Sequence, residues 1–83
     1  MMQPEELERL IRSGVDEAQV QVCGDGRHFQ ALVISPAFAG RSRLQRHRQV
    51  YAALREHLDA EALHAFSLRA LTPDEHNSEQ QTG

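Results

Sequence analysis

A glycine-rich turn between two strand-like stretches restricts the fold of this chain more than any other feature. Residues Gln19–Val22 alternate polar and apolar side chains, which predicts a half-buried strand. Residues His28–Ser35 are apolar on both faces at their centre, as in a strand inside a sheet. Between them stand Gly24, Asp25 and Gly26; glycine accepts positive φ, and Asp-Gly favours a type I′ turn. The two stretches are therefore expected to pair as an antiparallel hairpin.

Two amphipathic helices are predicted, one before and one after this hairpin. The first covers Pro4–Ser13, where Pro4 suits a first turn and Gly14 suits a C-terminal stop. The second covers Ser42–Leu58, and Ser42 with Gln45 is typical of a capping box. The apolar stripe expected on this second helix consists of Leu44, Val50, Tyr51, Leu54 and Leu58.

A third strand and a short last helix follow. Leu63–Leu71 alternates, so that Phe66, Leu68 and Ala70 are expected to face the core, and Ser67 and Arg69 to face solvent. Thr72 then caps a helix, with Pro73 at its first position and Glu75 at its third. We expect one domain over residues 1–76 and a polar, disordered tail over residues 77–83.

The order of these elements predicts the fold class. Eighty-three residues suffice for one small domain. The order α-β-β-α-β-α indicates an α/β (α+β) domain with a three-stranded mixed sheet and helices packed on one face. The hairpin is antiparallel, and the strand–helix–strand crossover is most simply parallel and right-handed. The second and third strands then begin at the same end of the sheet, which brings Cys23 or His28 towards His64.

These three residues could serve as metal ligands. A thiolate and imidazoles suit zinc, copper or an iron–sulfur centre. A closed structural zinc site needs four ligands, so a smaller set indicates either a site shared with a partner or no site. Spacing alone favours the second reading, in which Cys23 packs as a small apolar residue and both histidines cap sheet edges.

Arginines gather around the start of the second helix. The candidates for contacts with nucleic acid are Arg41, Arg43, Arg46 and Arg48. Free N–H groups over Ala39–Arg43 would suit an anion at the helix N-terminus. However, the net charge is -3, and these arginines read more simply as solvated flanks of a helix, with His47 partly buried in its stripe.

Other functional classes are disfavoured. The single cysteine excludes an internal disulfide framework. We find neither an apolar run that could span a bilayer nor a signal peptide, so a cytoplasmic location is expected. No catalytic constellation, P-loop or GxGxxG is present, and we expect neither enzymatic activity nor a small-molecule substrate.

The stretch from Gly24 to Glu75 resembles the BolA family, and most closely its IbaG-like branch. The resemblance rests on GDG-x-HF, VIS, F-x-G-x-SRLQRHR-x-VY, LHA-x-SL and TP-x-E, in this order along the chain. One departure is His76, where many members carry a tryptophan and a longer, basic last helix.

The resemblance implies a fold similar to class II KH domains and a partner, a monothiol (CGFS) glutaredoxin. The heterodimer would share a [2Fe–2S] cluster for iron–sulfur assembly or iron sensing, and the isolated protein would hold no cofactor. The glutaredoxin supplies a cysteine and the thiolate of glutathione; this chain supplies His64 and either Cys23 or His28, between which the resemblance does not decide. The alternative is a KH-like transcriptional regulator that binds DNA in a stress response or in control of the cell envelope and morphology.

Overall fold

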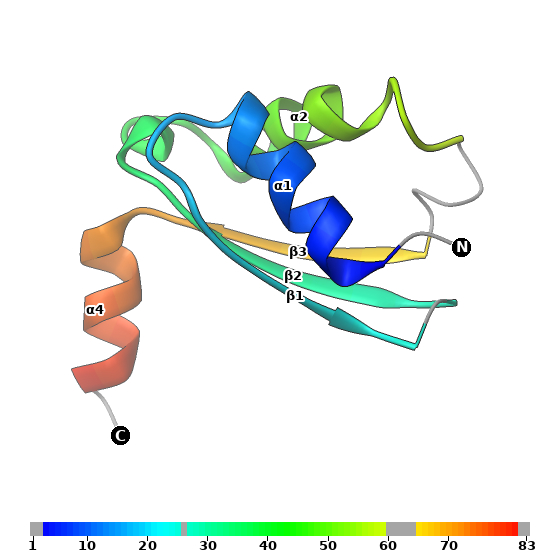
Figure 1. Ribbon diagram of the computed structural model, residues 1–83. Coiled ribbons are helices and arrows are strands. Elements are labelled where there is room, and N and C mark those ends of the chain that lie inside the picture. Colours follow the sequence, from blue (N-terminus) through cyan, green and yellow to red (C-terminus); the bar gives the residue numbers. More distant parts are fainter. Residues whose placement is uncertain (1–2, 26, 60–64, 82–83) are drawn as a thin grey trace.

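The computed structural model describes residues 3–25, 27–59 and 65–81. The elements along the chain are α1 (Pro4–Gly14), β1 (Gln19–Gly24), β2 (Phe29–Ile34), the 3₁₀ helix η1 (Pro36–Phe38), α2 (Arg43–Leu54), β3 (Phe66–Leu71) and α4 (Pro73–Gln81) (Figure 1).

The three strands form one mixed sheet with β2 at its centre. The strand order is β1-β2-β3; β1 and β2 are antiparallel, and β2 and β3 are parallel. Phe29 faces Gly24 across the first ladder and Phe66 across the second. The hairpin loop and the start of β3 therefore lie at the same end of the sheet. The fold class and the strand arrangement predicted from the sequence are confirmed.

The core lies between this sheet and the layer formed by α1 and α2 on one of its faces (Figure 1). The fully buried side chains include Leu7 and Ile11 of α1, Val33 of β2, and Val50 and Leu54 of α2. Each such side chain contributes about 1.5–3 kcal/mol through removal from water. The inward positions expected in the third strand are confirmed, since Phe66 and Ala70 are buried and Leu68 packs against the core.

The apolar stripe of α2 is narrower than the sequence predicts. The helix ends at Leu54, not at Leu58, and residues 55–57 form a turn in which His57 N–H donates to Leu54 O. Leu44 is 58% exposed. The buried face is centred on Val50 and Leu54, which lie about 100° around the helix from Leu44. Leu44 therefore belongs to the solvent-facing flank.

Helix α4 stands apart from the other two helices. It leaves the end of β3 and extends away from the layer of α1 and α2 (Figure 1). Thr72 and Glu75 cap its start, as predicted: Glu75 N–H donates to Thr72 Oγ1, and Thr72 N–H donates to Glu75 Oε1.

The helix is also longer than the sequence indicates. Residues 77–81, for which a disordered tail was expected, are helical, so the expected boundary at residue 76 does not coincide with the end of α4. An ion pair of 2.5 Å between Arg69 and Glu79 ties the later turns to β3. Residues 82 and 83 lie outside the described residues.

Candidate functional site

The loop between β1 and β2 is held by the carboxylate of Asp25. The ladder continues to the pair Gly24 and Phe29, and the type I′ turn expected at Asp25-Gly26 includes Gly26, which lies outside the described residues. Asp25 Oδ1 accepts hydrogen bonds from His28 N–H (3.0 Å) and Arg27 N–H (2.9 Å). These bonds lower the pKa of Asp25. Sequence reasoning missed this role, although aspartate commonly accepts hydrogen bonds from backbone N–H groups just beyond it.

Glycine is required at position 24, where the strand enters the loop. A Cβ atom there would overlap the carbonyl oxygen of His28 and would lie 2.8 Å from Phe29 Cδ1. The close approach of the two backbones closes the hairpin and sets the direction of the loop.

Two of the three predicted ligands lie in the described part of this loop region. Cys23 is a free, exposed cysteine paired with Gln30 across the ladder, and His28 is exposed at the end of the loop. Cys23 borders a hollow of about 370 Å³ on the side of the sheet that α1 and α2 leave open. The expectation that Cys23 packs as a small apolar residue is wrong, because its side chain is not buried.

The start of β3 meets this loop directly. Phe29 N–H donates to Ala65 O at 2.9 Å, which joins the first residue after the loop to the residue before β3. His64 lies outside the described residues. Within the described residues, no group of three or more histidine, cysteine or acidic side chains could hold a metal ion.

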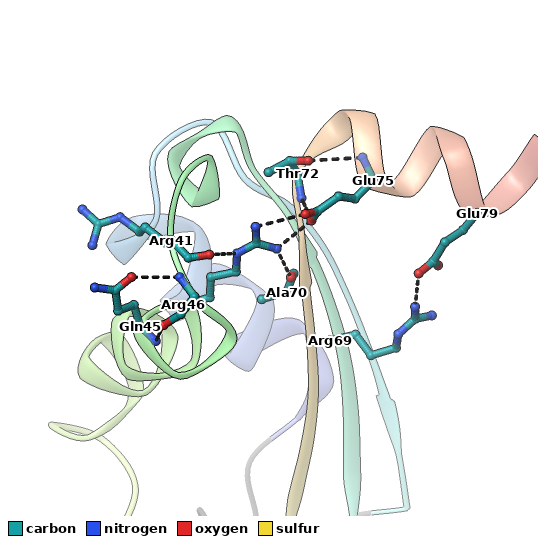
Figure 2. Close-up of polar contacts among 9 residues, drawn as sticks. Arg41, Gln45, Arg46, Arg69, Ala70, Thr72, Glu75 and Glu79 are labelled. Atoms are coloured by element: carbon teal, nitrogen blue, oxygen red, sulfur yellow. Dashed lines mark hydrogen bonds and ion pairs between the residues drawn. The ribbon is translucent and has the colours of Figure 1, made fainter.

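Arg46 is part of an intramolecular network rather than a solvent-exposed cation (Figure 2). Its guanidinium binds both carboxylate oxygens of Glu75, at 2.6 and 3.1 Å. It also donates to the carbonyl oxygens of Ala70 (2.9 Å) and Arg41 (3.0 Å). The guanidinium carbon lies 5.9 Å from the ring centroid of Phe38. These contacts leave little of the group available to a phosphate.

The hydrogen bonds of Arg46 and Thr72 change the acidity of Glu75. Arg46 is the main cause and Thr72 N–H the second, and together they lower the pKa of Glu75 to about 2. The carboxylate is therefore ionised throughout the neutral range. Sequence reasoning missed this pair, because its members are separated by 29 residues.

The other predicted arginines are exposed, and the anion site at the start of α2 is largely filled. Arg41, Arg43 and Arg48 are all exposed. The predicted capping box is confirmed: Gln45 N–H donates to Ser42 Oγ, and Ser42 N–H donates to Gln45 Oε1. Arg41 N–H donates to a backbone carbonyl. Several N–H groups expected to be free for an anion thus have partners within the chain.

His47 is half-buried, as predicted. Its ring meets the ring of Tyr51 edge-on, with centroids 6.2 Å apart. Burial, with a smaller effect from the charge of Arg43, lowers the pKa of His47. In this structure the imidazole of His47 packs against Tyr51.

No helix among the described residues has both the length and the apolar character needed to cross a bilayer.

Comparisons with known proteins agree on one family. The family model described as BolA-like protein matches residues 2–75. The chain is 34% identical over 74 residues to the acid stress protein IbaG of Escherichia coli K12. The matched region covers 89% of this chain and 88% of that protein.

Solved structures give the same result. A bolA homologue from Coxiella burnetii is 41% identical, with a TM-score of 0.80 over 93% of this chain and 99% of that one. Yeast Fra2 is 30% identical, with a TM-score of 0.70 over 90% of this chain and 84% of that one.

Proposed function

The chain belongs to the family of BolA-like proteins, and from this premise we propose that it is a cytoplasmic, non-enzymatic adaptor for a monothiol glutaredoxin. In the complex the two proteins share a [2Fe–2S] cluster that is assembled, transferred or used to sense iron. The glutaredoxin contributes a cysteine and the thiolate of bound glutathione. This chain contributes His64 and one residue of the loop between β1 and β2, Cys23 or His28.

The observation that carries this proposal is the junction between the loop and the start of β3. The hydrogen bond from Phe29 N–H to Ala65 O fixes the two segments together, and His64 directly precedes Ala65 in the sequence. A ligand from the loop and a ligand from the segment before β3 can thus serve one small cluster.

The donor set fits such a cluster. Thiolate and imidazole both ligate the irons of [2Fe–2S] centres, and replacement of thiolate by imidazole raises the reduction potential. Cys23 and His28 are exposed, so a partner has access to either.

The test is a titration of the chain into a [2Fe–2S]-loaded monothiol glutaredoxin, followed by visible absorption and circular dichroism. We expect a new spectrum at equimolar ratio, lost in His64→Ala and retained in His57→Ala, which removes an exposed histidine on the turn after α2. Cys23→Ser and His28→Ala then identify the loop ligand. An unchanged spectrum with the unmodified chain, and no complex on size-exclusion chromatography, would contradict the proposal.

A second candidate function is binding of DNA as a transcriptional regulator. It is favoured by Arg41 and Arg43, whose exposed side chains form no ion pair among the described residues. Arg48 of α2 is also exposed, whereas the side chain of Arg46 is bound to Glu75. This function requires affinity for duplex DNA that falls steeply with salt and is reduced in Arg41→Ala/Arg43→Ala. Affinity that is independent of salt would contradict it.

A further inference from the structure

The outer edge of β3 carries backbone groups that the sheet does not use. Phe29 N–H donates to Ala65 O, and Ser35 N–H donates to Leu71 O. In a parallel ladder these bonds alternate along each strand, so residues 65, 67, 69 and 71 direct their backbone groups to β2. The residues between them direct their N–H and C=O groups away from the sheet; these are Phe66, Leu68 and Ala70.

One of these outward groups already has a partner from outside the sheet. Arg46 donates to Ala70 O at 2.9 Å, which supports the assignment of the outward set and closes the edge at Ala70. No side chain or backbone group among the described residues bonds to Leu68 from that side. The open part of the edge is therefore short and lies at the middle of β3.

A hollow of about 570 Å³ borders this part of the strand. It is lined by Leu68–Leu71 of β3, by Arg43 and His47 of α2, and by Glu79 of α4. Figure 2 shows Arg46 on one side of the strand and the pair of Arg69 and Glu79 on the other. The edge at Leu68 therefore borders a recess formed by the described residues of α2, β3 and α4.

The recess carries unbalanced positive charge. Two of its four arginines are neutralised by acidic neighbours, in the pairs Arg46–Glu75 and Arg69–Glu79. Arg41 and Arg43 also line the recess, are exposed, and form no ion pair among the described residues. Carboxylates are the side chains in an extended peptide that complement this charge.

We infer that the outer edge of β3 at Leu68 binds an extended peptide segment rich in carboxylates, which adds as a short fourth strand beside Arg41 and Arg43. The peptide supplies both an N–H donor and a C=O acceptor for Leu68, as in strand addition to other sheet edges. A phosphodiester backbone can contact the arginines but has no donor for the Leu68 carbonyl. The observations therefore favour a peptide over nucleic acid.

This site is centred on the outer edge of β3 and not on the loop that carries the proposed cluster ligands, although Leu68 also lines the hollow that Cys23 borders. Cys23 and His28 lie at or beyond the end of the sheet where β3 begins, whereas Leu68 is at the middle of β3 and Arg41 lies beside its other end. The inference does not depend on a cluster, and its test uses the protein alone.

The test uses amide hydrogen exchange of the full chain with a blocked peptide of alternating glutamate and valine as the probe. In the free protein, Leu68 N–H is expected to exchange faster than the N–H groups of Ser67 and Arg69, which face β2. The peptide is expected to slow exchange at Leu68 about tenfold or more. A peptide of the same sequence, methylated on every backbone nitrogen, is expected to leave it unchanged.

Variants and competitors complete the test. We expect Arg41→Ala/Arg43→Ala to weaken peptide binding about tenfold. Arg48→Ala, which removes another exposed arginine from α2, is expected to leave it unaltered. The inference is overturned if the peptide leaves exchange at Leu68 unchanged, or if the methylated peptide binds equally well. It is also overturned if an oligothymidylate of equal charge binds more tightly and protects Leu68, because the edge would then be a nucleic-acid site.

Discussion

Arg46 and Glu75 connect the start of α2 to the start of α4 through two hydrogen bonds between guanidinium and carboxylate, of 2.6 and 3.1 Å. The same carboxylate accepts a hydrogen bond from Thr72 N–H, and the same guanidinium donates to Ala70 O. The end of β3 and the first turn of the last helix are thus joined to α2. Paired, planar groups of this kind are more specific and stronger than single neutral hydrogen bonds.

Removal of Arg46 is expected to destabilise the fold. Arg46→Ala leaves Ala70 O and Glu75 without their cationic partner, and hydrogen bonds to charged groups contribute about 1.5–3 kcal/mol each. We therefore expect the free energy of unfolding in urea to fall by about 2–3 kcal/mol. Arg48→Ala, an exposed change on the same helix, should alter it by less than about 0.5 kcal/mol. Equal effects of the two changes would contradict a structural role for Arg46.

Stability should decrease at acid pH through Glu75. Its pKa is about 2 in the folded protein, below the ordinary value of 4.5. A carboxylate with a lowered folded pKa contributes stability that is complete above about pH 4.5 and is lost as pH falls towards 2. Glu75→Gln should therefore reduce stability at neutral pH and flatten its dependence on pH between these values. Urea unfolding of both proteins over this range measures the difference; parallel curves would contradict the prediction.

The sequence predicted the sheet well because the signals for it are local. A hairpin is indicated by the alternating side chains of β1, by the apolar residues on both faces of β2 and by the glycines between the two strands. Because a strand–helix–strand crossover is normally parallel and right-handed, β3 is then expected beside β2. The capping residues Ser42 and Thr72 were likewise predictable, since each cap acts within one turn of its own helix.

The features that escaped sequence analysis depend on contacts between distant segments. Nothing near Arg46 indicates that its partner is Glu75, so its position in an arginine-rich stretch suggested a role in binding phosphate. The exposure of Leu44 depends on which face of α2 meets the sheet. The spacing of apolar residues alone leaves the orientation of that face uncertain by about a third of a helical turn. For the candidate site, the sequence predicted the shared end of the sheet but not the carboxylate of Asp25 that shapes the loop.

Gly14 is expected to tolerate no side chain, because it lies directly against Ala53 of α2. A Cβ atom at Gly14 would overlap Ala53 Cβ. Gly14→Ala should therefore lower the free energy of unfolding by about 1–3 kcal/mol, as in other overpacked cores, although alanine favours helix. The double change Gly14→Ala/Ala53→Gly should recover part of this loss. A double-mutant cycle in urea measures the coupling, and strict additivity would contradict direct contact.

Gly24→Ala should damage the proposed cluster site more than it damages the fold. The added Cβ must displace the backbone of His28. His28 and Cys23, the two candidate loop ligands, stand on either side of Gly24 and the loop. We expect a loss of about 1–3 kcal/mol in stability and a weaker or absent cluster spectrum with the glutaredoxin, measured under conditions where the variant is folded.

Gly40→Ala provides the matched control for this change. Gly40 has φ +75°, so alanine is strained there by about 1–2 kcal/mol, but a Cβ meets no atom within 4 Å. Gly40 precedes α2 and is not part of the loop between β1 and β2. Its substitution should lower stability to a similar extent and leave the cluster spectrum intact. A spectrum lost equally in both variants would show that stability, rather than the geometry of the loop, determines cluster binding.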